Sequence, residues 1–354
     1  MKTIIFTGGG TAGHVMPNLA LMDRLDPKEW TIHYIGTEEG IEHELLLQRP
    51  SIVYHAIAWG KLRRYFSWKN FTDPFRVVKG YFQSRKIMKT VKPDVLFSKG
   101  GYVTVPVVMA ARGKCPVICH ESDYSPGLAN KIASKFADTI CTTFADTVQK
   151  VPAGKGVHTG TPIRSALFEG SREKGLAFTG LTGEKPVLLV VGGSTGAKAV
   201  NEAVEAALDE LLKTFDVVHL CGQGKAGDTA PRPGYVRFEY VNREMADVLA
   251  LADVVVSRAG ANAVFELLAL KKPAVLIPLP LEASRGDQIL NAQYFERNGY
   301  AVHLPQSEAT PQKLVDTVLA LYGDRQKYMD AMAAAPGADG TENILRLIFR
   351  AVGE

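Results

Sequence analysis

The sequence predicts an α/β protein with two doubly wound domains, each built on a parallel sheet. The chain has 354 residues, which is more than one ordinary hydrophobic core holds and suits two domains. Short apolar segments alternate with helix-length segments throughout, as expected for parallel sheets that helices cover on both faces. Each half also opens with an apolar strand that runs into a glycine-rich turn.

Apolar runs bounded by turn residues predict the strands of each sheet. In the first half these are residues 3–7, 31–36, 94–101 and 116–121. In the second half they are residues 186–193, 215–222, 235–241, 252–260 and 273–280. Ligands of such sheets bind at the carboxyl ends of the strands, so two facing sheets would create one cleft between the domains.

A change of composition in the middle of the chain predicts the domain boundary. Gly160–Pro186 is rich in Gly, Thr and charged residues and is the best candidate for an interdomain linker. We therefore expect Rossmann-like domains at 1–162 and 163–335. The sequence AAAPGADG at 333–340 breaks the chain again, before a final helical segment at 341–352.

Charge is distributed unevenly along the chain. The first 150 residues carry 20 Lys and Arg against 13 Asp and Glu, whereas the whole chain carries 41 against 37. This asymmetry predicts an anionic partner for the first half. The four cysteines form no C-x-x-C pair, which indicates reduced thiols and argues against a metal cluster or a disulfide framework.

Hydropathy argues against a membrane span. No apolar run approaches the ~20 residues that cross a bilayer. The first apolar stretch, Ile4–Phe6, is too short for a secretory signal, so we expect the protein in the cytoplasm.

The first glycine-rich turn matches the spacing of a dinucleotide site. Gly8, Gly10 and Gly13 satisfy G-x-G-x-x-G, and backbone N–H groups at such a turn can contact a phosphate or a sugar. A dinucleotide fold usually places an acid ~20 residues later. Glu38 and Glu39 come late for that role, so the nicotinamide interpretation is weak. A tight connection without a ligand is the alternative.

His14 directly follows this turn, at the predicted start of a helix. A helix N-terminus disfavours the charged imidazolium, and a neutral imidazole is what a general base needs. The alternative is a packed or solvent-facing histidine.

The second glycine-rich turn, GGSTGAK at 192–198, adds the Ser194 and Thr195 hydroxyls to the N–H groups of another helix start. It lacks G-x-x-x-x-G-K-[ST], so an ATPase is not expected. Arg164, in GTPIR, suits bidentate phosphate binding, although it could be an ordinary linker residue.

Two later segments offer groups for a sugar or a nucleoside. Asn262 is a candidate N-cap, which would place Glu266 in the first turns of the following helix. There its carboxylate could accept the ribose hydroxyls or merely interact with the helix dipole. Asp287, Gln288 and Asn291 present a carboxylate and amides at another helix start.

The segment 61–92 carries ten Lys and Arg and one acidic residue, interleaved with aromatic residues that include Trp68 and Phe71. Nucleic-acid binding is one interpretation. A membrane surface is another, because basic residues attract anionic head groups while aromatic residues enter the interface. A solvated basic helix over core aromatics is the third.

Seven motifs together resemble the MurG family of peptidoglycan N-acetylglucosaminyltransferases. They occur in the same order as in that family, and the resemblance covers essentially the whole chain. They are GGGTAGHVMPNLAL, SKGGYVTVPVVMAA, HESDYSPGLANKIA, GTPIR, VVGGSTGAKAVN, SRAGANAVFE and DQILNA. The resemblance implies the GT-B fold, with a C-terminal helix at about 336–354 that packs back on the first domain. It also implies an inverting transfer of N-acetylglucosamine from UDP-N-acetylglucosamine to the C4 hydroxyl of the muramyl sugar of lipid I. No cofactor or metal is implied.

The resemblance also assigns roles to individual residues. His14 would be the candidate base, with Glu121 or Asp123 as the fallback. The residues expected to bind substrate are Thr11, Ala12, Gly13, Asp123, Arg164, Ser194, Val241, Glu266 and Gln288. Thr11 to Gly13 would line the acceptor region, Arg164 and Ser194 would hold the diphosphate, and the Val241 backbone would meet uracil. Glu266 would take the ribose, and Gln288 the N-acetylglucosamine hydroxyls.

Two positions depart from the family pattern. Where the family often has H-E-Q-N, this chain has H-E-S-D at 120–123, so the expected Asn contact becomes Asp123. A common Q-Q pair becomes Asp287–Gln288.

The expected partners are UDP-N-acetylglucosamine, lipid I and the anionic inner surface of the cell membrane, with no nucleic acid. The protein is expected to lie on the cytoplasmic face of that membrane as a peripheral protein. A related glycolipid transferase, a UDP-N-acetylglucosamine 2-epimerase and a non-catalytic sugar-nucleotide-binding membrane adaptor are the alternatives.

Overall fold

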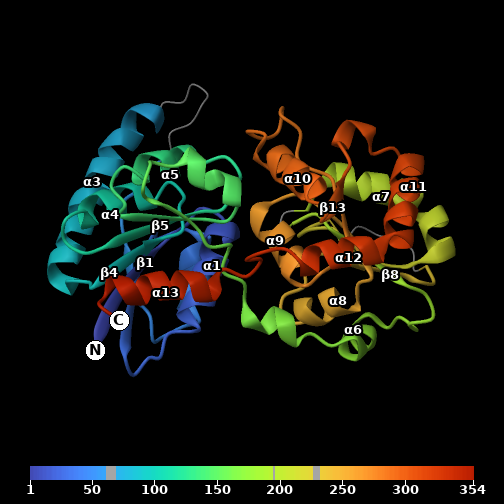
Figure 1. Cartoon of the computed structure of the whole chain (residues 1–354), viewed down its shortest axis with the longest axis horizontal. Coiled ribbons are helices and arrows are strands. Elements are labelled where there is room, and N and C mark those ends of the chain that lie inside the picture. Colours follow the sequence, from blue (N-terminus) through green and yellow to red (C-terminus); the bar gives the residue numbers. More distant parts are fainter. Residues whose placement is uncertain (61–68, 194–195, 226–231) are drawn as a thin grey trace. The chain divides into compact units, whose positions relative to one another are not determined.

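The computed structural model describes residues 1–60, 69–193, 196–225 and 232–354, which divide into two compact units (Figure 1). Unit 1 comprises Met1–Arg164 and Asp339–Glu354, and unit 2 comprises Ser165–Ala338. Each unit contains one all-parallel sheet with helices between its strands. The predicted fold class, two doubly wound α/β domains, is confirmed.

The sheet of unit 1 has seven strands in the order β3-β2-β1-β4-β5-β6-β7. The strands are β1 (Lys2–Thr7), β2 (Trp30–Gly36), β3 (Val53–Ala56), β4 (Val95–Ser98), β5 (Val117–Glu121), β6 (Thr139–Thr142) and β7 (Gly156–His158). The helices are α1 (Ala12–Met22), α2 (Ile41–Leu47), α3 (Lys69–Val91), α4 (Thr104–Ala111), α5 (Leu128–Ala133), the short 3-10 helix η1 (Ala145–Lys150) and α13 (Thr341–Ala351).

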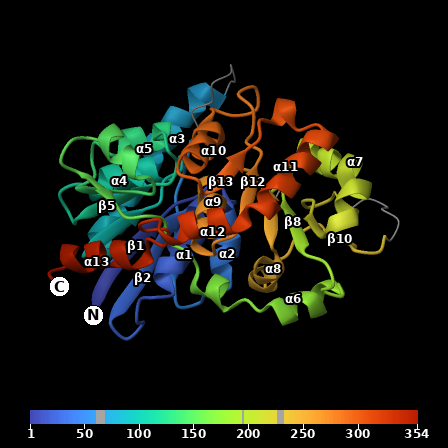
Figure 2. The same ribbon diagram turned by 45° about the vertical axis from the view of Figure 1, so that its right-hand side comes forward.

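The C-terminal helix α13 belongs to unit 1 although unit 2 precedes it in the chain. Its apolar side chains Ile344, Leu345 and Ile348 join the core beneath β1 and β4, and Figures 1 and 2 both show α13 along this sheet. The Gly340 N–H donates to the Thr161 carbonyl at 2.8 Å. The strongly amphipathic sequence of this helix therefore has its buried face in unit 1.

The sheet of unit 2 has six strands in the order β10-β9-β8-β11-β12-β13. The strands are β8 (Val187–Val191), β9 (Asp216–Leu220), β10 (Tyr235–Phe238), β11 (Val254–Ser257), β12 (Ala274–Leu276) and β13 (Ala301–His303). The helices are η2 (Ser165–Glu169), α6 (Arg172–Thr179), α7 (Lys198–Thr214), α8 (Met245–Leu251), α9 (Ala261–Ala269), α10 (Asp287–Arg297), η3 (Gln306–Glu308), α11 (Pro311–Gly323) and α12 (Arg325–Ala333).

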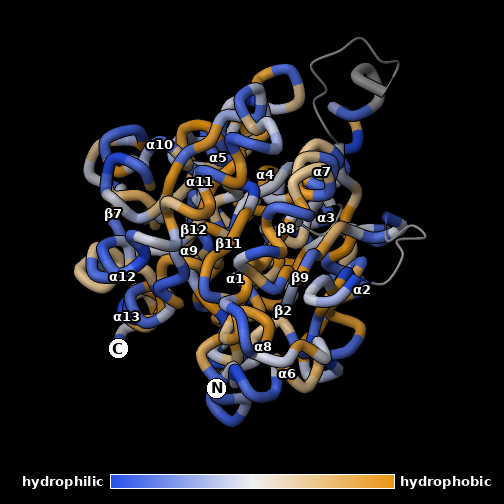
Figure 3. The backbone as a smooth tube through the Cα atoms, turned by 90° about the vertical axis from the view of Figure 1, so that its right-hand side faces the viewer, coloured by the Kyte–Doolittle hydropathy of each residue, from blue (hydrophilic) through white to orange (hydrophobic). Residues whose placement is uncertain are grey.

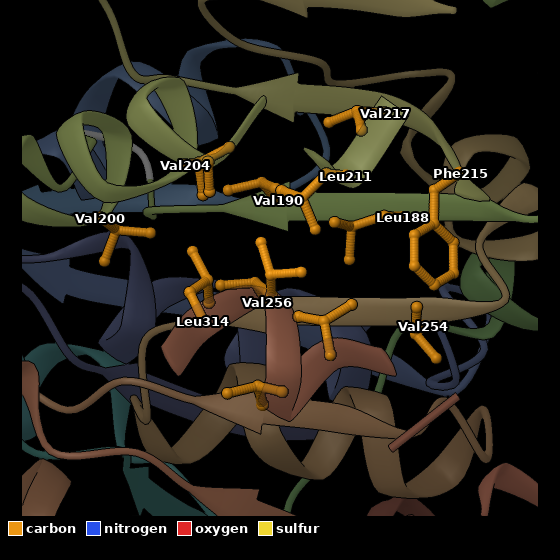
Figure 4. Close-up of a cluster of buried hydrophobic side chains, with 14 of the residues drawn as sticks. Leu188, Val190, Val200, Val204, Leu211, Phe215, Val217, Val254, Val256 and Leu314 are labelled. Atoms are coloured by element: carbon orange, nitrogen blue, oxygen red, sulfur yellow. The ribbon is translucent and has the colours of Figure 1, made fainter. Parts of the chain in front are cut away.

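The central strands of unit 2 are buried on both faces, as their unbroken apolar sequences predict. In β8, Leu188, Leu189 and Val190 are all fully buried, so side chains on both faces of the strand are covered. Figure 3 shows β8 and β11 as hydrophobic segments of the tube. On one face, β8 and β11 pack against Val204 and Leu211 of α7 (Figure 4).

Two expectations from the sequence need correction. The predicted linker Gly160–Pro186 contains η2 and α6, because Ser171 caps α6 by accepting from the Lys174 N–H at 3.4 Å and Phe178 stacks on Phe238. Four short strands, β3, β6, β7 and β13, were not predicted. Each has only three or four residues, too few for a clear periodic pattern.

Candidate functional site

The order of strands reverses at one point in each sheet, and some of the predicted site residues follow the strands at those points. The reversal falls between β1 and β4 in unit 1 and between β8 and β11 in unit 2. Such switch points are where open α/β sheets bind their ligands. In unit 1, Thr11 to His14 follow β1, and Glu121 and Asp123 end or follow β5. In unit 2, Glu266 lies on α9 and Gln288 on α10.

The glycines of the first turn are required by close packing. An added Cβ at Gly8 would lie 2.5 Å from the His14 carbonyl oxygen. At Gly10, whose φ is +88°, it would lie 2.6 Å from the Tyr102 ring. Any side chain at either position would displace the turn or the start of α1.

A buried carboxylate beneath this turn was missed by the sequence analysis. Glu42 is fully buried and accepts from the Gly10 N–H at 3.2 Å, the Thr37 N–H at 3.0 Å and the Thr37 hydroxyl at 2.7 Å. An N–H group that could contact a phosphate is therefore occupied by an acidic side chain. This arrangement disfavours a dinucleotide phosphate at Gly10 and weakens the nicotinamide interpretation further.

His14 is held by the residue that begins its helix. The Thr11 hydroxyl lies 3.1 Å from His14 Nδ1, and the His14 N–H donates to the Thr11 carbonyl at 3.0 Å. Thr11 makes no side-chain cap to α1, so its hydroxyl contacts the imidazole ring instead. Ala12 and Gly13 form the first turn of α1 beside it, half-buried.

Glu121 at the end of β5 organises the loop that carries Asp123. Its carboxylate accepts from the Asp123 N–H at 2.9 Å, the Gly127 N–H at 3.1 Å and the Asn130 side-chain amide at 2.8 Å. Burial, and then the charge of Asp123, raise the pKa of the Glu121 carboxyl to about 7. These contacts give Glu121 a structural role in the loop, whereas Asp123 is only half-buried.

Near the turn after β8, neutral side chains of α7, β9 and β10 are hydrogen-bonded to one another. The Asn201 amide donates to the Cys221 carbonyl at 2.8 Å, and the His219 ring lies between Asn201 and the Tyr235 hydroxyl. Burial, and then the charge of Arg237, lower the pKa of His219 to about 4, so this ring is neutral. Ser194, the predicted diphosphate contact, lies outside the described residues.

Arg164 is the last residue of unit 1. Its Nε atom is buried and has no hydrogen-bond partner among the described residues. The preceding Ile163 N–H contacts Thr341 at 3.2 Å, which fixes the backbone at this position.

Helix α9 begins one residue earlier than the predicted cap. Gly260, not Asn262, is the N-cap, and no side chain caps the helix. Glu266 is therefore in the second turn, half-buried, where interaction with the helix dipole is weaker. Arg258, a second residue that the sequence analysis missed, donates to the Ile277 and Pro278 carbonyls at 2.9 and 3.0 Å and to Gln306 at 2.8 Å.

Helix α10 begins at Asp287, as the sequence analysis expected. Gln288 accepts from the Leu279 N–H at 3.1 Å through its side-chain oxygen. Asn291 is fully buried and donates to the Ala259 carbonyl at 3.0 Å, so it joins α10 to the end of β11. Asp287 pairs with Arg285 at 2.6 Å.

The loop after β10 carries the remaining predicted contact. Val241 lies there, between β10 and α8, with a buried side chain. Among the described residues, no cluster of three or more His, Cys, Asp and Glu could hold a metal ion.

Comparisons with known proteins identify both domains of the chain. Residues 4–142 match the glycosyltransferase family 28 N-terminal domain, and residues 187–346 match the C-terminal domain of the same family. The UDP-N-acetylglucosamine--N-acetylmuramyl-(pentapeptide) pyrophosphoryl-undecaprenol N-acetylglucosamine transferase of Lachnospira eligens is 52% identical over 98% of this chain and 99% of its own.

Two solved structures extend the comparison. The crystal structure of Acinetobacter baumannii MurG matches with a TM-score of 0.75 and 28% identity, over 99% of this chain and 100% of that one. The UDP-GlcNAc 2-epimerase of Neisseria meningitidis matches with a TM-score of 0.66 and 13% identity, over 99% of this chain and 100% of that one. At that identity the epimerase shares the fold alone.

The two Rossmann-like units and both family 28 domains define a glycosyltransferase of the GT-B fold. Within that class, the chain belongs to the MurG family of N-acetylglucosaminyltransferases.

Proposed function

We propose that this enzyme transfers N-acetylglucosamine from UDP-N-acetylglucosamine to the C4 hydroxyl of the muramyl sugar of lipid I, with inversion, to make lipid II for peptidoglycan synthesis. The observation that carries the proposal is the identity of about half the residues to transferases named for this reaction, over 98% of the chain. Unit 1 would bind the acceptor, and unit 2 the UDP-sugar.

His14 is the proposed general base. To accept a proton at Nε2, the ring must carry its hydrogen on Nδ1 and donate it to the Thr11 hydroxyl, 3.1 Å away. Thr11 would then orient the base and select its tautomer, as the third member of a catalytic triad does. Ala12 and Gly13 would line the path of the attacking hydroxyl.

The donor would be held mainly by unit 2. Arg164 and the amides of the turn that contains Ser194 would stabilise the departing diphosphate. The Val241 backbone would meet uracil, Glu266 would accept the ribose hydroxyls, and Gln288 would bind the sugar. Because Gln288 accepts from Leu279 through its oxygen, its amide N–H₂ is the group that would donate to a sugar oxygen.

We also propose that unit 1 attaches to the anionic cytoplasmic face of the cell membrane through α3. Phe75, Val78 and Phe82 are 79%, 54% and 61% exposed and are spaced along one face of the helix. Among the side chains of α3 that the structure describes, the exposed basic residues are Arg76, Lys79, Arg85, Lys86 and Lys89. Apolar side chains flanked by cations suit an anionic lipid surface.

Two aromatic residues of the basic segment that the sequence analysis singled out cannot be placed: Trp68 and the side chain of Phe71 lie outside the described residues. None of the described helices combines the length and the hydrophobicity that a membrane crossing requires.

The test uses radiolabelled UDP-N-acetylglucosamine with and without a lipid I analogue. We expect labelled lipid only when the acceptor is present. Epimerised sugar without transfer would support the epimerase alternative. Binding of the nucleotide and of vesicles without either product would support a membrane adaptor.

A further inference from the structure

Lys99 is a buried cation at the switch point of unit 1. It directly follows β4, and its side chain is fully buried. Its N–H donates to the Thr7 carbonyl of β1 at 2.9 Å, which fixes its position between the two central strands. The Lys99 ammonium donates to the Ser122 hydroxyl, in the loop after β5.

The two carboxyl groups on either side of Ser122 influence the Lys99 ammonium through their charge. Burial lowers the pKa of Lys99 to about 8, and the charges of Glu121 and Asp123 oppose this effect. Two further titratable groups near Lys99 are His120, whose pKa burial holds well below its usual value, and Cys141, whose pKa burial raises to about 12. His120 and Cys141 are therefore neutral at pH 7, whereas Lys99 is a buried cation whose charge acts on the two acids.

Glu121 and Asp123 differ in their contacts and in their place in the family pattern. Glu121 receives three hydrogen bonds from the loop and from Asn130. Asp123 occupies the position where the family often has a neutral Asn, as the sequence analysis noted. An Asp at this position adds a negative charge two residues from Glu121. Without a nearby cation, the two carboxyl groups would repel each other when both are ionised, so one of them would tend to retain a proton.

We propose that Lys99 is a positioning residue for acceptor recognition: it holds the Ser122–Asp123 turn and balances the Asp123 charge, so that a carboxylate can replace the neutral amide at this contact. The inference rests on the proposed function. Asp123 would then accept hydrogen bonds from acceptor hydroxyls. Lys99 and Asp123 together would replace a single neutral Asn in recognition of the acceptor.

A double-mutant cycle tests this pairing with Lys99→Met, Asp123→Asn and the double variant. We expect Lys99→Met to lower kcat/KM for the lipid I analogue by about 10- to 100-fold, with KM for UDP-N-acetylglucosamine little changed. Asp123→Asn should lower it by less. The double variant should recover about tenfold over Lys99→Met, because it removes both charges together.

The pH profile separates charge balance from simple packing. In Lys99→Met, loss of the cation should raise the pKa of the Glu121–Asp123 pair above the value of about 7 that Glu121 has in the wild type. The variant's kcat/KM for the acceptor should therefore fall as pH rises above neutrality, where the pair loses its shared proton and repels itself. The double variant should lack this additional slope. Lys272→Met is the matched control: this half-buried lysine of unit 2 donates to the Ala250 and Ala252 carbonyls, and its loss should show no coupling to Asp123→Asn.

The outcomes decide between the two proposals. If the wild type makes no labelled lipid, the proposed function fails and this inference fails with it. If the wild type transfers normally but the two substitutions are simply additive and the pH slope is unchanged, only the role of Lys99 is overturned. If Lys99→Met alone does not fold, recovered folding and transfer in the double variant support the pairing, and failure of both variants to fold rejects it.

Discussion

The two glycine-rich turns look alike in sequence, but the groups beneath them differ in charge. The turn after β1 lies on the buried Glu42 carboxylate, which accepts from the Gly10 N–H. Near the turn after β8, Asn201 of α7 donates to the Cys221 carbonyl and contacts the neutral ring of His219. The carboxylate beneath the first turn disfavours a phosphate there. The proposed function therefore assigns the acceptor hydroxyl to the first turn and the donor diphosphate to the second.

The largest expected effect is on turnover and comes from substitutions of His14, which follows the first glycine-rich turn. His14→Ala should lower kcat by about 10²- to 10⁴-fold, the usual contribution of a general base. UDP affinity should change little, because the nucleotide is expected on unit 2. His14→Gln should be nearly as damaging, since an amide cannot take the proton at neutral pH. Steady-state kinetics and calorimetric titration of UDP measure the two effects.

The pH profile provides the control for His14. The turnover of the wild type should show a pH-dependent limb, and the residual activity of both variants should lack it. If His14→Gln keeps normal turnover and the same profile, His14 only positions the acceptor. The base would then have to be sought at Asp123 or Glu121.

The proposed binding of the donor by unit 2 is tested at Glu266, the proposed ribose contact. Glu266→Ala should weaken UDP binding by about 1.5–3 kcal/mol, the contribution of a hydrogen bond to a charged group. Calorimetric titration measures it, and the melting temperature checks that the fold is retained. The exposed Glu282 of unit 2 provides a matched control in Glu282→Ala. Equal UDP affinities for the wild type and Glu266→Ala would remove Glu266 from the site.

A substitution at Glu42 tests whether its carboxylate stabilises the turn after β1. Glu42→Gln should destabilise unit 1 by about 1–3 kcal/mol, because the new amide N–H₂ would face donors that the carboxylate now satisfies. Chemical denaturation measures the loss. Glu44→Gln, at an exposed position on the same helix, should be neutral. Equal stability of both variants would mean that the carboxylate does not hold the turn.

The smallest expected effect concerns the surface of unit 1. Phe75→Ser and Phe82→Ser should each weaken binding to anionic vesicles by about 3- to 10-fold, since each removes one partly inserted aromatic ring. Added salt should weaken binding as well. Cosedimentation measures both, with Phe168→Ser, at a 49% exposed position of unit 2, as the matched control. Binding to DNA but not to vesicles would reverse the assignment.

The two departures from the family pattern also have different surroundings. Asp123 lies in a loop that Lys99 contacts from the buried interior. Asp287 pairs with Arg285, whose side chain is 40% exposed. A buried charge is screened far less than an exposed one. Loss of Lys99 should therefore matter more than loss of Arg285.

Much of the architecture could be predicted from the sequence alone. Strands such as β1 and β8 are continuous apolar runs that end in glycines, and their periodicity and length determine where strand, turn and helix follow one another. The sequence analysis also expected Asp287, Gln288 and Asn291 near a helix start, and α10 begins at Asp287. Strand β3 was not, because its four residues at the sheet edge are partly exposed and carry no clear apolar pattern.

The sequence by itself determined the fold class, the two glycine-rich turns and the family motifs, because these depend on local spacing and on residue type. Only the tertiary structure decided what lies beneath the turns. Glu42 reaches Gly10 across 32 positions of the chain, and Lys99 reaches Ser122 across 23. Helix packing and strand order bring such partners together, and burial away from water then strengthens the interaction between their charges.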